Sequence, residues 1–199
     1  FDDAVFAAPV KGGGWTIMVA IADVAHYVRP KSALDGEARR RGNSVYLPDR
    51  VVPMLPEALS NDLCSLRPDE PRAAMVVEMS FDGAGGMLDA VFHRALIRSS
   101  ARLTYDQVQA WHEGTVSAGD IGTAAEILQN LFGAWQALDS ARQERQPLAL
   151  NLKERRVLLD KSGSPVEITQ RSQSESQRLI EDFMIAAPDA AAQALIRAK

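Results

Sequence analysis

The chain of 199 residues carries 22 Lys and Arg against 26 Asp and Glu, which gives a formal net charge of −4 at pH 7. Hydrophobic residues make up 46% and charged residues 24% of the chain, values that exclude a disordered or collagen-like protein. The acidic balance also excludes the polybasic-tail mode of nucleic-acid binding, although local clusters of basic residues can still contact phosphates.

The cysteine content and the polarity of the chain indicate a reducing compartment. Cys64 is the single cysteine, so no intrachain disulfide can form, and no run of 18 apolar residues is present. Asp2 and Asp3 are incompatible with the basic start of a signal peptide. We therefore expect a cytoplasmic protein without a membrane partner, whose oligomeric state the sequence leaves open. Because the first residue is Phe1 rather than Met, we expect a piece of a longer protein.

The first half of the chain predicts a buried strand, a helix and a long irregular segment. Residues 15–21 form a short apolar run that follows three consecutive glycines, which predicts a strand entered through a turn. These glycines precede a strand and open no helix, so they match no nucleotide-binding loop, and we expect no nucleotide cofactor. Ser32 followed by Asp35 predicts a helix that ends near Gly42. Five prolines between residues 43 and 71 exclude a long regular element there.

The chain after residue 71 predicts two hairpins and three helices. The hairpins comprise strands 73–81 with 87–97 and strands 156–159 with 166–168. Thr104 and Ser174 each precede a Gln at the capping-box position and predict helix starts, and apolar spacing from Leu128 to Leu138 predicts a helix that ends before Pro147. Pro188 predicts an irregularity in the last helix. These elements indicate an α+β (mixed α/β) fold in which helices pack on a mixed sheet.

Few residues suggest chemistry when they are considered singly. Asp2 and Asp3 could ligate Mg²⁺, which prefers carboxylate oxygens, but a terminal pair of aspartates is commonly just solvated. Asp23 follows a predicted strand, at a position where ligands often bind in α/β sheets. We expect His26 to be packed or exposed rather than a general base. Cys64 is expected to be a small buried residue.

The irregular segment carries the most specific pattern. Residues 41–56 (RGNSVYLPDRVVPMLP), continued by 57–66 (EALSNDLCSL), resemble the central signature of the ribonuclease II / ribonuclease R catalytic (RNB) domain family, and the details are closer to the R branch. Further matches occur in the same order along nearly the whole chain, at residues 1–6, 19–24, 101–105 and 179–187. Such an ordered series is far more specific than any lone short motif.

The resemblance implies a hydrolytic, processive 3′ to 5′ exoribonuclease that uses Mg²⁺ and releases nucleoside 5′-monophosphates from the 3′ end of single-stranded RNA. In this family an Asp, followed after five residues by Asp-x-Asp-Asp, binds metal and directs the attacking water. Phe1 matches the x, so Asp2 and Asp3 match the last two carboxylates, and the first two would precede this sequence. Two metal ions can stabilise both the attacking and the leaving oxygen of a phosphodiester.

The same resemblance assigns RNA-binding roles to two further residues. Tyr46 matches an aromatic residue that stacks on the 3′-terminal nucleotides, and Glu181 matches an acidic residue that contacts the terminal nucleotide. Considered alone, Tyr46 would be a partly buried loop aromatic and Glu181 a glutamate on a helix surface. In the II branch a second aromatic residue clamps the terminal base, and its position corresponds to Leu152. Because leucine is not aromatic, this position does not supply the second half of the clamp.

The departures from the family leave three interpretations open. The family's later Arg-rich motif, its upstream cold-shock domains and its downstream S1 domain are not in these 199 residues, so residues 1–199 correspond to a partial, incomplete RNB catalytic domain. The first interpretation is part of an exoribonuclease, with little or no activity of the isolated chain. The second is a non-catalytic RNA-binding remnant or truncated relative, and the third is that only the fold persists.

Overall fold

The structure is a computed structural model that describes residues 3–117, 122, 124–145, 154–160, 162–171 and 173–198. The chain divides into two compact units. The first comprises Phe1–Ala22, Leu66–Leu148 and Ser174–Lys199, and the second comprises Asp23–Ser65 and Ala149–Gln173. Among the described helices, none has the length and apolarity needed to cross a bilayer.

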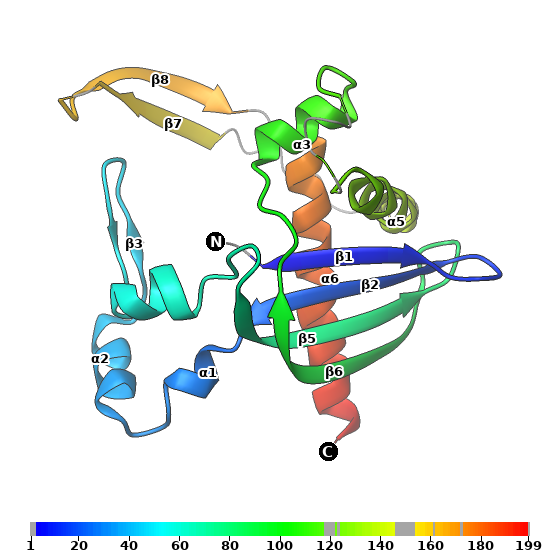
Figure 1. Cartoon of the computed structure of the whole chain (residues 1–199), viewed down its shortest axis with the longest axis horizontal. Helices are drawn as coiled ribbons and strands as arrows, with labels where there is room; N and C mark the ends of the chain where they lie inside the picture. Colours follow the sequence, from blue (N-terminus) through cyan, green and yellow to red (C-terminus); the bar gives the residue numbers. More distant parts are fainter. Residues whose placement is uncertain are drawn as a thin grey trace. The chain divides into compact units, whose positions relative to one another are not determined.

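A four-stranded sheet is the framework of the first unit (Figure 1). Its strands are β1 (Ala4–Pro9), β2 (Trp15–Ala22), β5 (Pro71–Phe81) and β6 (Met87–Arg98), in the order β1-β2-β5-β6. The sequence predicts β2, β5 and β6, and the structure confirms these three strands. Strand β1 is not among the predicted elements. Each neighbouring pair of these strands is antiparallel, where the sequence predicts a mixed sheet.

Glycines make the two tight turns of this sheet possible. The predicted turn before β2 is present, and Gly14 has a φ of 95°, which side-chain-bearing residues rarely adopt. A Cβ at Gly14 would also collide with the Phe81 carbonyl oxygen. In the β5–β6 turn, Gly85 has a φ of 80° and lies against the backbone of Ala137. A larger residue at Gly14 or Gly85 would therefore displace neighbouring backbone atoms.

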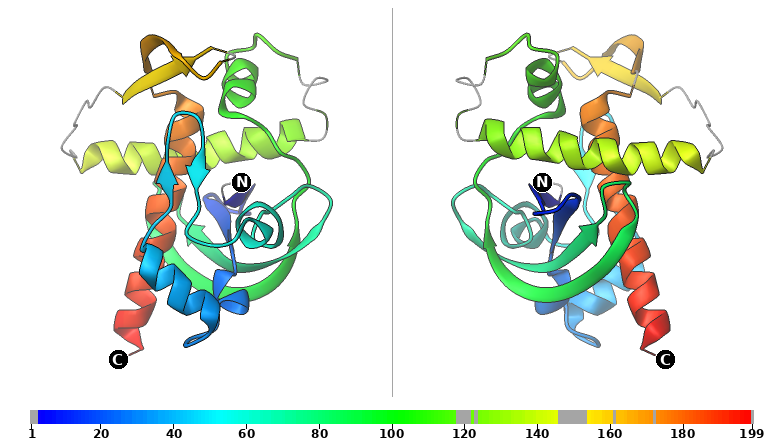
Figure 2. Two further views of the ribbon diagram at one scale, coloured as in Figure 1. Left: turned by 90° about the vertical axis from the view of Figure 1, so that its left-hand side faces the viewer. Right: turned by 90° about the vertical axis from the view of Figure 1, so that its right-hand side faces the viewer.

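Among the described residues, three helices complete the first unit: α3 (Tyr105–His112), α5 (Ala124–Glu144) and α6 (Glu175–Arg197). Helix α5 packs against β1 and α6, whereas α6 packs on β2 and β5, with α3 beside its first turns (Figures 1 and 2). Both predicted capping boxes are present: the Thr104 and Ser174 side chains accept hydrogen bonds from the Gln107 and Gln177 backbone. The predicted α+β class is confirmed.

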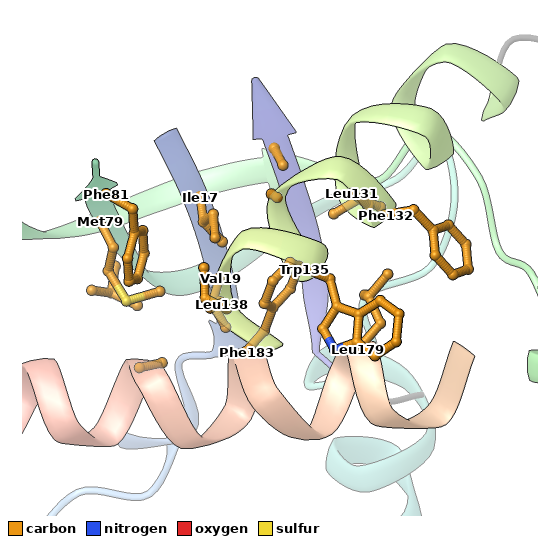
Figure 3. Close-up of a cluster of buried hydrophobic side chains, with 14 of the residues drawn as sticks. Ile17, Val19, Met79, Phe81, Leu131, Phe132, Trp135, Leu138, Leu179 and Phe183 are labelled. Atoms are coloured by element: carbon orange, nitrogen blue, oxygen red, sulfur yellow. The ribbon is translucent and has the colours of Figure 1, made fainter. Parts of the chain in front are cut away.

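The core lies between the sheet and helices α5 and α6 (Figure 3). The register pairs Ile17 with Met79 and Val19 with Val77, so these four side chains share one face of the sheet and are buried. Ala7 of β1 and Phe81 of β5 belong to the same cluster. The helices contribute the remaining buried side chains, which are Leu128, Leu131, Phe132, Ala134, Trp135, Leu138, Leu179, Phe183, Ala187 and Ala190. The predicted spacing from Leu128 to Leu138 therefore marks the buried face of α5.

Polar contacts of Asp182 also join α5 to α6 across this apolar interface. Trp135 Nε1 on α5 donates a hydrogen bond of 2.8 Å to Oδ2 of Asp182 on α6, and both residues are buried. The other carboxylate oxygen of Asp182 lies 3.3 Å from Nη1 of Arg142, which also pairs with Asp139. Burial raises the pKa of Asp182, although the Trp135 hydrogen bond and the Arg142 charge oppose this shift.

Helix α6 is continuous, so the irregularity predicted at Pro188 is wrong. The ring removes one backbone hydrogen bond, to the Met184 carbonyl, but the helix runs from Glu175 to Arg197. Ala187 and Ala190, on either side of the exposed Pro188, are buried in the core. The packing of this face of α6 therefore outweighs the local cost of the proline.

The described part of the second unit consists of short elements. These are α1 (Val24–Tyr27), α2 (Ala33–Arg41), β3 (Val45–Tyr46), β4 (Val51–Val52), a π-helical segment η1 (Ala58–Leu63), β7 (Glu154–Leu159) and β8 (Pro165–Arg171). Strands β3 and β4 pair with each other, as do β7 and β8, and the latter pair confirms the second predicted hairpin. The proline-rich segment contains no long element, as the sequence predicts.

The Asp182 contact gives a prediction for stability. In Asp182→Ala the Trp135 N–H is buried without an acceptor and Arg142 loses a partner, so we expect unfolding to become about 1–3 kcal/mol easier. Urea denaturation followed by circular dichroism measures this change. Asp189→Ala is the control, because Asp189 lies on the exposed side of the same helix and bonds only to Gln193 among the described contacts. An equal loss in both variants would contradict a special role for Asp182.

Candidate RNA-binding hairpin and carboxylate site

Tyr46 lies on a small hairpin and is highly exposed. It pairs with Val51 across the β3–β4 ladder, and Val45 pairs with Val52. The Tyr46 side chain is 79% exposed, and the other three hairpin residues are also exposed. This differs from the partly buried loop aromatic that Tyr46 would be if considered alone. A tyrosine with its ring in solvent can stack on a planar ligand without displacing neighbouring side chains.

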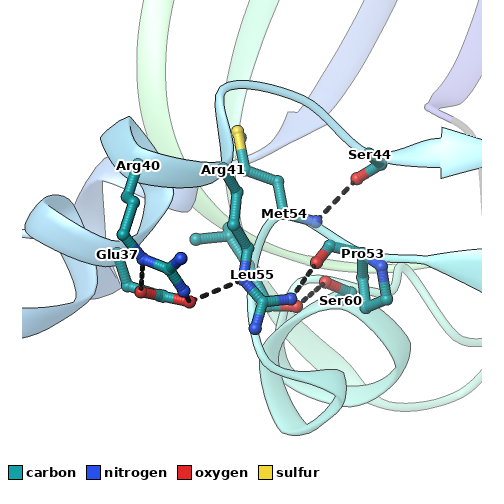
Figure 4. A network of polar contacts seen from close by, with 8 residues as sticks. All are labelled: Glu37, Arg40, Arg41, Ser44, Pro53, Met54, Leu55 and Ser60. Carbon is teal, nitrogen blue, oxygen red and sulfur yellow. Dashed lines mark hydrogen bonds and ion pairs between the residues drawn. The ribbon is translucent and has the colours of Figure 1, made fainter.

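Side chains close the base of this hairpin (Figure 4). The Ser44 hydroxyl, directly before β3, accepts a hydrogen bond of 2.9 Å from the Met54 backbone N–H. Nη1 of Arg41 donates a hydrogen bond of 2.9 Å to the carbonyl oxygen of Pro53, directly after β4. At the tip, the Leu47 N–H bonds to the Arg50 carbonyl. The hairpin is thus tied to the end of α2.

Helix α2 forms where the sequence predicts it. The Ser32 hydroxyl accepts a hydrogen bond from the Asp35 backbone N–H, and Gly42, with a φ of 80°, ends the helix. Arg41 is the last helical residue. Its backbone is therefore next to the point where the chain turns towards β3, and its guanidinium group reaches Glu37 and Pro53.

Glu37 is shared by two arginines of α2. Arg40 donates to both carboxylate oxygens, at 2.7 and 2.8 Å, and Arg41 Nε donates to one of them at 2.7 Å. These hydrogen bonds, first from Arg40 and then from Arg41, lower the pKa of Glu37 to about 2. The carboxylate consequently stays charged at neutral pH and orients both guanidinium groups.

The carboxylate pair at the chain start is described only in part. Asp3 is half-buried and directly precedes β1, whereas Asp2 lies outside the described residues. Among the residues that the structure describes, no group of three or more His, Cys, Asp or Glu side chains is placed to hold a metal ion. Asp3 by itself does not form a metal site.

Glu181 lies on the surface of α6, in the second turn of the helix. Its neighbour Asp182 is buried against α5, so the backbone at Glu181 is fixed while its side chain is exposed. Asp3 and Glu181 belong to the first unit and Tyr46 to the second. The position of Leu152 lies outside the described residues.

Comparisons with known proteins decide the family. The model of the RNB domain matches residues 1–199. The chain belongs to the RNB domain family. Ribonuclease R of Escherichia coli K12 is 41% identical over 205 residues, which cover all of this chain and 25% of that protein. Ribonuclease R of Thermotoga maritima is 38% identical, over 97% of this chain and 27% of that protein. The chain thus spans about a quarter of these curated relatives.

Solved structures agree with this assignment. Mycoplasma genitalium RNase R in complex with ribose methylated single-stranded RNA superimposes with a TM-score of 0.93 and 35% sequence identity. The superposition covers 99% of this chain and 31% of the other. The RNB resemblance predicted from residues 41–66 is therefore confirmed, together with its closeness to the R branch.

Other candidates take different places in the RNB fold. Asp23 is buried at the start of α1. The pKa of the Cys64 thiol is raised, first by the burial of the thiol and then by the charge of Asp23. Cys64 is half-buried, whereas the sequence predicts a buried residue. His26 is exposed and its ring meets Tyr27 edge-on.

His112 has contacts that sequence reasoning missed. Its ring stacks on Phe132 with centroids 3.8 Å apart, and its Nε2 lies 3.0 Å from Glu175 Oε2. These partners are 20 and 63 residues away in the chain, so no local pattern could show them. His112 therefore joins α3 to α5 and α6.

The Glu37 network predicts a pH dependence. A carboxylate with a lowered pKa stabilises the folded state above the ordinary pKa of 4.5, and this contribution is lost as the pH falls towards 2. We expect the side-chain carboxyl ¹³C resonance of Glu37 to titrate near pH 2. In Arg40→Ala/Arg41→Ala the midpoint should rise towards 4.5. A midpoint near 4.5 in the unaltered chain would contradict the paired geometry.

Proposed function

We propose that the chain forms part of a hydrolytic, processive 3′ to 5′ exoribonuclease that releases nucleoside 5′-monophosphates from single-stranded RNA. The match of the RNB model to all 199 residues carries this proposal. The relatives named Ribonuclease R support it, as does a similar RNase R solved with single-stranded RNA. We propose further that residues 1–199 are one part of the RNB domain, and that the cold-shock and S1 domains belong to other parts of the full-length protein.

The proposed role of Asp2 and Asp3 is to hold a divalent metal, Mg²⁺, beside the scissile phosphate. One described carboxylate does not suffice for this, so the proposal requires Asp2 and the two family carboxylates that would precede Phe1. Mg²⁺ accepts such oxygen ligands and would supply charge stabilisation for the phosphodiester. The position of Asp3 directly before β1 favours the role, because the paired strand fixes the backbone next to it.

The proposed role of Tyr46 is to hold the last nucleotides by stacking. Its ring is exposed on a hairpin whose base is tied by Ser44 and Arg41. Stacking on an aromatic ring tolerates every base, which suits an enzyme that degrades RNA of any sequence. Glu181 would contact the terminal nucleotide from the exposed side of α6.

The metal role predicts the effect of one isosteric change. In the full-length protein that contains this chain, Asp3→Asn keeps the side-chain volume but removes the charge, so turnover should fall by at least 100-fold. RNA binding in a gel-shift assay should change little, because the stacking residues remain. Asp35→Asn, on α2 in the second unit, is the matched control. Turnover within a few-fold of the parent would show that Asp3 is no ligand.

The stacking role predicts a different result for Tyr46. Tyr46→Ala should weaken the hold on the terminal nucleotides by about 1–3 kcal/mol and lengthen the final product, with metal dependence unchanged. Tyr46→Phe should be nearly silent, because it retains the aromatic face. Digestion of a 5′-labelled oligonucleotide displays the product ladder. An unchanged final fragment for Tyr46→Ala would return Tyr46 to the role of an ordinary surface residue.

A further inference from the structure

The β3–β4 hairpin lacks the usual sources of stability. Its two strands are only two residues long each, and all four strand residues are exposed. A two-stranded hairpin of this kind is marginal in water, because few backbone hydrogen bonds and little buried apolar surface oppose its conformational entropy. Contacts from outside the strands must therefore hold it in one conformation.

Arg41 supplies such a contact from the end of α2. Its Nη1 donates to the Pro53 carbonyl, one residue beyond β4, while its Nε donates to Glu37 in the preceding turn of the helix (Figure 4). The Glu37 carboxylate fixes the guanidinium plane, since a guanidinium group presents its donors in a rigid fork. The second tie, from Ser44 to the Met54 N–H, closes the same end of the hairpin.

We propose that Arg41 is a positioning residue, which holds the β3–β4 hairpin so that Tyr46 is presented in a fixed orientation. This inference rests on the proposed stacking role of Tyr46. Arg41 joins the helix to the hairpin: its Nε donates to Glu37 and its Nη1 to Pro53, and its side chain is 39% exposed. It acts through Tyr46 and need not touch RNA.

The neighbouring arginine provides a matched control. Arg40 has the same charge and shares the Glu37 carboxylate, but its side chain is 73% exposed, and within the described part of the chain its hydrogen bonds go to Glu37 alone. A role in which α2 attracts RNA phosphates would make Arg40 at least as important as Arg41. A positioning role distinguishes the two, because only Arg41 bonds to the segment that carries Tyr46.

The first arm of the test measures the hairpin itself. Brief trypsin digestion of the full-length protein is followed by mass spectrometry of the cleavage after Arg50, at the hairpin tip. Cleavage requires local opening, so its rate reports the open population. Arg41→Ala should accelerate it about tenfold, as expected for the loss of one hydrogen bond to a charged group. Ser44→Ala should act in the same direction, and Arg40→Ala should remain at the parent rate.

The second arm measures the hold on RNA. Arg41→Ala should lengthen the final product of a 5′-labelled oligonucleotide, and Arg41→Ala/Tyr46→Ala should be no worse than Tyr46→Ala alone. Arg41→Lys keeps the charge but ends in one nitrogen, so it should resemble Arg41→Ala. The slope of log affinity against log salt should stay at the parent value, whereas a lost phosphate contact would reduce it by about one.

The outcomes separate this proposal from the proposed function. Unchanged cleavage after Arg50 in Arg41→Ala would overturn the positioning role, as would an altered final product in Tyr46→Ala but not in Arg41→Ala. A parent-like final product in Arg41→Lys, together with a reduced slope of log affinity against log salt in Arg41→Ala, would instead assign Arg41 to a phosphate contact. If Tyr46→Ala leaves the final product unchanged while Arg41→Ala still accelerates cleavage, the stacking role fails and the anchoring of the hairpin by Arg41 stands.

Discussion

The hydrogen bond from Trp135 to Asp182 is the contact around which the first unit is organised. It joins α5 to α6 inside an otherwise apolar interface, and the same carboxylate meets Arg142. The hydrophobic effect is non-directional, whereas a buried donor and acceptor must face each other. The bond therefore fixes how the two helices lie on the sheet, and it fixes the backbone at Glu181, the next residue.

The elements with strong local signals could be predicted from the sequence. Capping boxes at Thr104 and Ser174 gave helix starts, and the glycine-rich turn between two apolar runs gave the β5–β6 hairpin. Strand β1 was missed because its six residues combine small and apolar side chains without clear alternation. Pro188 predicts an irregularity in a helix that is continuous. The burial of Ala187 and Ala190 in the core is a tertiary effect that a local rule does not contain.

The candidate site depended on the family pattern rather than on the residues taken singly. Nothing in the composition distinguishes Tyr46 from other aromatics, and its high exposure is visible only in the structure. Asp3, in the first unit, and Tyr46, in the second, are 43 positions apart in the sequence. The anchoring of the hairpin was equally invisible, since the bond from Arg41 to Pro53 spans 12 residues of irregular chain.

The contacts at the base of the β3–β4 hairpin determine which segment could be transferred to another protein with the hairpin intact. Strands β3 and β4 span residues 45–52, but the contacts that hold them come from Arg41, Ser44, Pro53 and Met54, with Glu37 behind Arg41. A graft of the strands and their tip onto another scaffold would leave behind every one of these restraints. A graft that begins at Ser32, the N-cap of α2, and ends at Met54 would carry the helix, the arginine and the hairpin together. For protein engineering, the transferable module is this helix–hairpin segment, which presents Tyr46 at its exposed end.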